Sequence, residues 1–255
     1  MISGNDDDWR LCFELGTNHL GSFLRLENMV RKIGDLSERV SVTVQIKEES
    51  FYEKFPDYEL TGQNYLDFIE LCHKLEIQCG LALGPLENVQ NLKKQGINPD
   101  FIKTLSIASA DPIFMEKLCR TFVCPKYISV GLSSISYIKD TILPFLSNED
   151  MLIHTCLSHD SSDQNLLDIQ QMKNLGKLVC YGLHSIDHEL IYAAIGAGAE
   201  KIFVYTGDKN LNLTDLHHAV DLEDVYNYSY KVTSCFNAMR ASNGDPKKSS
   251  ITFIG

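Results

Sequence analysis

The sequence predicts a single-domain α/β fold in which a parallel sheet closes into a barrel. Eight short apolar runs recur along the 255 residues, and segments with the helical spacing of apolar residues separate them. Eight alternating strand and helix units in a chain of this length are typical of the (β/α)8 or TIM barrel. No linker rich in Pro, Gly or Ser divides the chain, so we expect one barrel over residues 1–240 and a flexible tail over 241–255.

Each expected strand is a short run of aliphatic residues, and the run at 40–47 is the clearest. Aliphatic and polar residues alternate there, and successive strand side chains point to opposite faces. Four aliphatics should therefore pack under helices, while Ser41, Thr43, Gln45 and Lys47 share the other face. The expected strands are 11–15, 40–46, 77–83, 101–105, 126–130, 151–156, 177–181 and 201–205.

The expected helices lie between these strands. They cover 23–33, 65–72, 89–94, 112–119, 135–146, 166–175, 188–197 and 222–239. Side chains that suit a helix N-cap precede three of them, at Asp111, at Ser133 or Ser134, and at Asp187. An open doubly wound sheet is the alternative architecture. Its nucleotide-binding version is weakened because no G-x-G-x-x-G turn follows the first strand.

Composition limits the partners and the compartment. A net charge of −11 argues against nucleic acid or an anionic membrane as the main partner. No apolar stretch approaches the roughly 18 residues of a membrane span, and the first residues are polar rather than signal-like. The eight cysteines are scattered without a Cys-x-x-Cys pair, so we expect reduced core thiols and a cytoplasmic protein.

Polar residues gather where the expected strands end, which is where α/β barrels place their active sites. They are Glu14, Asn18, His19, Gln45, Lys47, Lys103, Ser106, Ser129, His154, Ser158, His159, His184, Ser185, Tyr205 and Asp208. Lysines and hydroxyls suit a phosphate or carboxylate, and histidines suit a divalent cation. Lys103 lies within a short apolar strand, where an unpaired ammonium is costly, so we expect it to be paired or functional.

Several of these residues have simpler interpretations. Lys47 precedes Glu48 and Glu49, which is also typical of a solvated charge cluster. His19 lies in a turn, where a structural hydrogen bond is as good an explanation as catalysis. The remaining histidines that we place in helices are expected to be surface or capping groups; they are His73, His188, His217 and His218.

From about Phe13 to Asp215, the chain resembles the barrel domain of the N-acetylneuraminate (sialic acid) synthase family. The family's opening motif, E-[IL]-G-x-N-H-x-G, matches residues 14–21, and its second-strand glutamine matches Gln45. Its Tyr-Lys-Ile-x-Ser and Ile-Leu-Ser-x-Gly segments match residues 102–106 and 127–131. Its Leu-His-Cys and Gly-Tyr-Ser-Asp-His segments resemble residues 153–155 and 180–184.

The resemblance implies a transferase that condenses phosphoenolpyruvate with an N-acylated sugar aldehyde, giving a nonulosonic acid and phosphate. It implies catalytic roles for Glu14, His19 and Lys103, and a divalent metal, Mn²⁺ or Mg²⁺, bound by His184. The substrate-binding residues that it implies are Asn18, Gln45, Lys47, Ser106, Ser129, His154 and Asp215. The expected partners are phosphoenolpyruvate and an amino sugar, and the sequence leaves open whether the chain forms a homodimer.

The chain departs from the family pattern at several of these positions. Thr43 stands where the family has a lysine, and Lys47 on the same strand face is a hypothetical substitute. The family's acidic residue after the fourth strand falls near Ala108. Its serine-aspartate pair before the metal histidine is replaced by Gly182 and Leu183. Tyr205 replaces the second metal histidine, and a tyrosine is a poor ligand for manganese or magnesium unless ionised. We expect no antifreeze-like C-terminal domain.

Three hypotheses about function remain at this point. The chain is an active phosphoenolpyruvate-dependent synthase with an altered metal site, or an impaired relative that binds a small anion or sugar and acts in regulation. The third is a barrel of another class, such as a phosphosugar aldolase that uses Lys103 to form a Schiff base.

Overall fold

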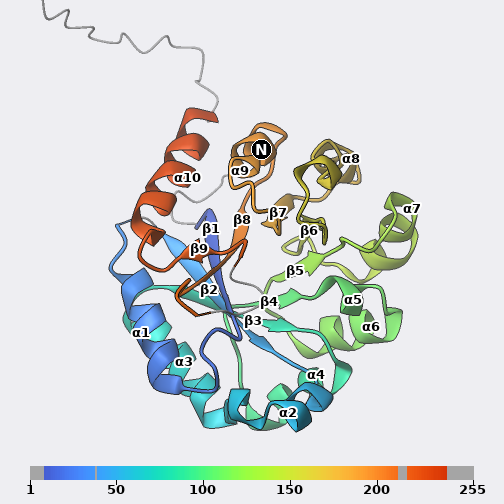
Figure 1. Cartoon of the computed structure of the whole chain (residues 1–255). Coiled ribbons are helices and arrows are strands. Elements are labelled where there is room, and N and C mark those ends of the chain that lie inside the picture. Colours follow the sequence, from blue (N-terminus) through green and yellow to red (C-terminus); the bar gives the residue numbers. More distant parts are fainter. Residues whose placement is uncertain (1–8, 38, 212–216, 240–255) are drawn as a thin grey trace, which may run out of the picture.

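A computed structural model describes residues 9–37, 39–211 and 217–239 of the chain. Within them, parallel strands follow one another in sequence order, and β1 also pairs with β8, which closes the barrel (Figure 1). The strands are β1 (Leu11–Gly16), β2 (Val40–Ile46), β3 (Gln78–Leu83), β4 (Phe101–Thr104), β5 (Lys126–Ser129), β6 (Met151–Thr155), β7 (Val179–Leu183), β8 (Ile202–Gly207) and β9 (Val220–Asp221). The predicted TIM barrel is thus confirmed.

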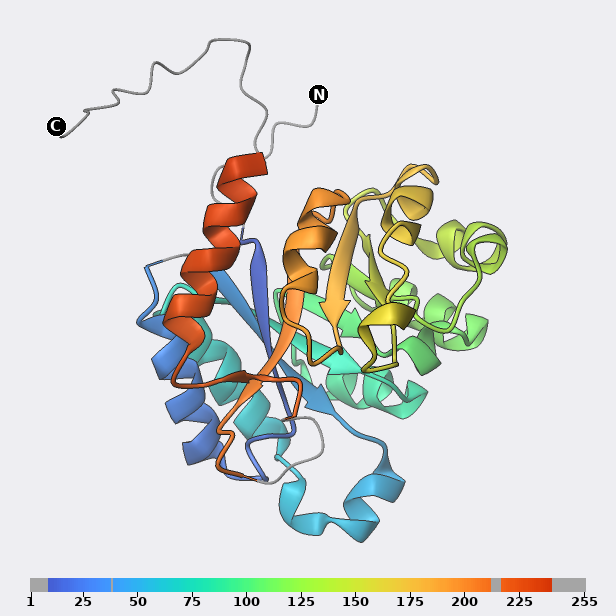
Figure 2. The ribbon, with the colours of Figure 1, turned by 45° about the horizontal axis from the view of Figure 1, so that its top comes forward.

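Helices surround the strands on the outside of the barrel, as Figure 1 shows. The α-helices are α1 (Phe23–Gly34), α2 (Glu49–Lys54), α3 (Gly62–Lys74), α4 (Leu86–Gln95), α5 (Ser106–Ser109), α6 (Pro112–Thr121), α7 (Ile135–Tyr137), α8 (Asp168–Lys173), α9 (Leu190–Gly196) and α10 (Val225–Met239). Short 3-10 turns cover Pro56–Tyr58, Leu143–Phe145 and Ser161–Asp163, and a π-helical turn covers Ile138–Ile142. The terminal helix α10 packs beside α9 (Figure 2).

Helix capping agrees with two of the three predictions. The Asp111 side chain accepts a hydrogen bond from the Ile113 amide at the start of α6. Ser134, rather than Ser133, caps α7 by accepting from the Tyr137 amide. Asp187 is not a cap, because α9 begins two residues later than expected, after Glu189.

Other boundaries also differ from the prediction. The strand expected over 177–181 is shifted, and β7 runs to Leu183 because its residues pair with β6 on one side and β8 on the other. The short helix α2 and the following 3-10 turn are additional elements, and contacts between aromatic rings such as Phe51 and Phe55 stabilise them. His188, His217 and His218 lie in turns and bends rather than in helices, which corrects that prediction.

The sheet is buried on both faces. On β2, the four aliphatic residues join the outer core under the helices, as predicted. The alternating residues Ser41, Thr43 and Gln45 face the barrel interior and are also buried, so neither face of this strand is wet. No helix among the described residues combines the length and the apolar character that crossing a membrane requires.

An inner apolar cluster closes the barrel at the N-terminal ends of the strands. Trp9 lies at its centre, with ring centroids of Phe101, Tyr127 and Phe203 at 5.3–5.6 Å from its own. The Lys201 ammonium lies 4.0 Å from the Trp9 ring centroid and donates to its carbonyl. Because the floor is filled, a ligand can enter the barrel only from the opposite end, where the predicted site residues lie.

Candidate functional site

A buried ion pair crosses the barrel interior toward the C-terminal ends of the strands. The Lys103 ammonium, from β4, donates a hydrogen bond to the Glu14 carboxylate, from β1. The two residues are only 4% and 3% exposed. The rings of Phe203 and Tyr205 lie 5.9 and 6.0 Å from the ammonium and complete this setting. The prediction that Lys103 is paired is therefore confirmed.

Hydroxyl groups gather at the end of β5, at the end of β6 and at the start of α5, which follows β4. Ser106 Oγ and Ser129 Oγ are 2.8 Å apart, and Ser129 also donates to Thr155 Oγ1 at 3.1 Å. Gly131 leaves room for this arrangement, because a Cβ there would lie 2.3 Å from the Thr155 carbonyl oxygen and 3.1 Å from Ser106 Oγ. We call Ser106, Ser129 and Thr155 the hydroxyl cluster. With rotating O–H groups, it can offer donors to an anionic oxygen.

Asn18 and His19 lie in the loop after β1, where both are held by local contacts. The Asn18 amide donates to the Thr206 carbonyl at 2.9 Å, and so ties this loop to β8. The Gly21 amide donates to His19 Nδ1 at 2.9 Å. Burial lowers the pKa of His19 to about 4, and its Nε2 has no hydrogen-bond partner among the described residues. Near neutral pH the ring is therefore uncharged.

This burial predicts a pH-dependent stability. The unfolded chain binds a proton on His19 near pH 6.5, whereas the folded chain resists it until about pH 4. The free energy of unfolding should therefore decrease as the pH falls through this window, by up to about 1.4 kcal/mol per pH unit for one such group. Urea unfolding across the window measures the slope. His19→Asn, whose Oδ1 can accept from the Gly21 amide, should give a shallower slope, and an unchanged slope would contradict the assignment.

Three other predicted residues have different surroundings. Gln45 is buried on the inner face of β2, level with Ala82 of β3. His154 lies between Ile153 and Thr155, whose side chains point into the barrel, so the His154 side chain points outward. There its Nε2 donates a hydrogen bond to the Gln164 carbonyl. The substrate contact predicted for His154 does not agree with this position. Asp215 lies outside the described residues.

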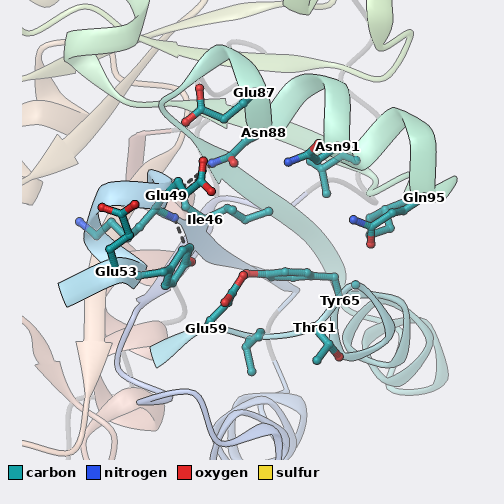
Figure 3. A pocket seen from close by; sticks show the side chains of 16 residues that line it. Ile46, Glu49, Glu53, Glu59, Thr61, Tyr65, Glu87, Asn88, Asn91 and Gln95 are labelled. Atoms are coloured by element: carbon teal, nitrogen blue, oxygen red, sulfur yellow. Dashed lines mark hydrogen bonds between the residues drawn. The ribbon is translucent and has the colours of Figure 1, made fainter. Parts of the chain in front are cut away.

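Lys47 follows β2 and lies beside the short helix α2. Its ammonium lies 5.4 Å from the centre of the Phe51 ring, in a pocket of about 510 Å³ between α2, α3 and α4 (Figure 3). Four carboxylates line this pocket, those of Glu49, Glu53, Glu59 and Glu87. Their charge disfavours a phosphate. This pocket therefore does not suit phosphoenolpyruvate, and the position of Lys47 gives no support to its role as a substitute lysine.

Histidines gather above the ion pair. The His184 ring stacks on that of His218 at 5.4 Å, and Tyr205 meets both edge-on at 5.5 and 5.2 Å. His159 and His217 adjoin His218, with ring centroids at 5.0 and 4.7 Å from it. Sequence reasoning missed His217 and His218 as site residues. The adjacent histidines in the segment after the eighth strand were the available signal.

The electrostatic surroundings keep two of these rings neutral. Burial, with smaller contributions from Lys103 and the neighbouring histidines, lowers the pKa of His184 to about 3. Burial and the adjacent histidines lower the pKa of His218 to about 4. A neutral imidazole is the form that binds a metal. His184 therefore fits a divalent ion, whereas Tyr205, with its phenol at the second expected position, does not.

Comparisons with known proteins identify the family and the fold. The NeuB family model matches residues 25–243. N-acetylneuraminic acid synthetase from Leptospira borgpetersenii, solved with citrate, superposes with a TM-score of 0.82 at 19% identity, over 95% of this chain and 89% of that one. SpsE from Bacillus subtilis gives 0.78 at 17% identity, over 91% of this chain and 69% of that one.

More distant barrels share the fold as well. A truncated 3-deoxy-D-arabino-heptulosonate 7-phosphate synthase from Thermotoga maritima gives a TM-score of 0.71 at 11% identity, over 93% of this chain and 91% of that one. No curated protein matches the sequence. The structural matches establish the fold, and the family model covers most of the chain. This protein therefore belongs to the NeuB family.

Proposed function

We propose that this protein condenses phosphoenolpyruvate with an N-acylated sugar aldehyde and releases phosphate. The observation that carries the proposal is the Glu14–Lys103 ion pair, buried beside the hydroxyl cluster at the open end of the barrel. An ammonium and several hydroxyls provide the donors that a phosphate and a carboxylate need. Membership of the NeuB family and the fold shared with sialic acid and heptulosonate phosphate synthases support the same class of reaction.

The proposed roles follow from these positions. Lys103, Ser106 and Ser129 hold the phosphoenolpyruvate anion, and Glu14 orients Lys103 and serves as acid or base near the reacting carbon. A carbon–carbon bond forms between the phosphoenolpyruvate methylene and the aldehyde carbon, water adds, and phosphate leaves. The divalent ion that the family resemblance implies would, when bound, polarise the aldehyde oxygen as a Lewis acid. The family resemblance assigns its ligand to His184, whose ring is largely buried at the barrel mouth.

The aldolase hypothesis fits the structure less well. A Schiff-base lysine needs an uncharged amine in an apolar pocket, whereas Lys103 is held in an ion pair with Glu14. A role in binding or regulation without catalysis is favoured by one observation, the phenol of Tyr205 at the expected second metal position. We retain it as the second candidate function.

The test is phosphate release from phosphoenolpyruvate, measured with N-acetylmannosamine and related N-acylated sugars. Each acceptor is tried with Mn²⁺, with Mg²⁺, with Zn²⁺ and with a chelator. We expect release that requires both an acceptor and a divalent ion, together with a product one pyruvate unit longer. No release with any acceptor, alongside measurable phosphoenolpyruvate binding, would contradict the enzyme and support the binding protein.

A further inference from the structure

Three histidines from two distant segments meet beside the barrel mouth. His159 belongs to the loop between β6 and α8, and His217 and His218 belong to the segment between β8 and β9. One ring nitrogen from each can be chosen so that all three lie within 4.8 Å of one another. We call these residues the three-histidine cluster. Its position differs from that of the His184–Tyr205 pair to which the family resemblance points.

The orientation of His159 favours metal binding. Its Nδ1 lies 2.5 Å from the His184 carbonyl oxygen, which can only accept, so Nδ1 carries the proton and Nε2 carries the lone pair. The Ser185 hydroxyl donates to the His159 carbonyl at 2.9 Å and fixes the same segment. Histidine ligands of metals commonly donate their other N–H to a backbone carbonyl in this way. The ring is thus held in the required tautomer.

His218 provides an independent observation. It is only 2% exposed, and neither of its ring nitrogens has a hydrogen-bond partner among the described residues. A buried polar atom without a partner is costly because it has lost its hydrogen bonds to water, so a fold seldom keeps one without a compensating role. A metal ion bound jointly by His218 and the neighbouring histidines would give one of these nitrogens a partner.

The dimensions and the donor types indicate which ions fit. Zinc–nitrogen bonds of about 2.0–2.1 Å place the ligand atoms of a tetrahedral site about 3.4 Å apart. The ligand atoms lie within 4.8 Å of one another before any ion is bound, so binding would draw the three rings closer together. Imidazole nitrogens without a carboxylate suit Zn²⁺, Co²⁺ or Ni²⁺ and disfavour Mg²⁺.

We propose that His159, His217 and His218 bind a divalent transition-metal ion, with a fourth coordination position open to solvent or a ligand. The ion would lie beside the His184 ring rather than between His184 and Tyr205, and residues after β8 would take over the role lost at Tyr205. The site stands on its own geometry and does not depend on the proposed condensation.

The experiment uses tag-free full-length protein, stripped with a chelator and titrated with Co²⁺ in the absence of substrates. We expect saturable binding of one ion and the visible absorption of a tetrahedral Co²⁺–imidazole complex. His159→Gln and His217→Gln alter exposed side chains, and circular dichroism checks that they fold. Each should weaken binding by about 100-fold or more, since even outer-sphere changes cost about 10- to 100-fold. Binding by the wild type that is unchanged in both variants would overturn the proposal, as would no binding by the wild type.

Two further variants separate the alternatives. His73, Cys79 and Asp100 form the other group among the described residues whose ligand atoms lie within metal-binding distance, near the N-terminal ends of β3 and β4. His73→Gln should leave the Co²⁺ spectrum and affinity unchanged, and loss of binding in this variant would place the ion there instead. His184→Gln should retain the Co²⁺ spectrum, and this result does not depend on condensation activity because the readout is metal binding alone. Loss in His184→Gln but not in His159→Gln would place the ion at the family position and overturn the proposal.

Discussion

Replacing Lys103 with methionine should abolish phosphate release and strongly destabilise the fold. The ammonium is the charged donor assigned to the proposed anion site, so its loss should lower the rate by at least about 10²–10³-fold. The Glu14 carboxylate would be left buried without its partner, and breaking a buried ion pair in this way costs about 3–5 kcal/mol. Phosphate-release assays and urea unfolding measure the two effects.

Substituting Glu14 as well tests whether the loss of stability in Lys103→Met comes from the unpaired carboxylate charge. Glu14→Leu combined with Lys103→Met removes both charges, so the double variant should be more stable than Lys103→Met alone. It should remain inactive, because the ammonium that donates hydrogen bonds to the phosphoenolpyruvate anion is still missing. A double variant as unstable as the sum of the single ones would contradict this explanation.

Lys126 provides a matched control. Its ammonium pairs with Asp150 at 3.4 Å, and both side chains are as buried as those of the Glu14–Lys103 pair. However, Lys126 begins β5 and Asp150 directly precedes β6, at the N-terminal ends of these strands. Lys126→Met should therefore lose stability without losing phosphoenolpyruvate binding by the folded protein. Equal loss of binding in both variants would show that binding follows stability rather than the identity of the lysine.

Much of the fold could be predicted because the physical signals are local. The alternation over 40–46 located β2 at its observed bounds, and Asp111 before Pro112 located the start of α6. The displacement of β7 has another cause: its end is decided by pairing with β6 and β8, which a single run of residues does not contain. The aromatic contacts that stabilise α2 are likewise tertiary.

The sequence predicted the types of residue in the candidate site but not which of them contact one another. The sequence predicted a partner for Lys103, and the barrel's closure decides that the partner is Glu14 on the opposite wall. The outward direction of His154 follows from strand alternation, since its neighbours face inward, and this signal was available in the sequence. The meeting of His159 with His217 and His218 depends on two loops whose paths no local pattern specifies.

The second large effect is expected at the other end of the barrel. Trp9→Ala should reduce the free energy of unfolding by about 3–5 kcal/mol, because a buried ring packed on Phe101, Tyr127 and Phe203 would be replaced by a cavity. The indole also donates to Gln78 Oε1 at 2.7 Å, which would lose its partner. Trp9 is the sole tryptophan of the chain, so the variant has no tryptophan fluorescence to follow. Urea unfolding is therefore followed by circular dichroism.

Trp9→Phe separates the packing from the hydrogen bond. A phenyl ring retains most of the apolar contact but not the N–H donor, so this variant should lose only about 1 kcal/mol. Both variants should retain the affinity for Co²⁺, because the three-histidine cluster lies at the opposite end of the barrel from the inner apolar cluster. A cost below about 1 kcal/mol for Trp9→Ala would show that the barrel tolerates an open floor. Ligand entry from one end would then no longer follow from the structure.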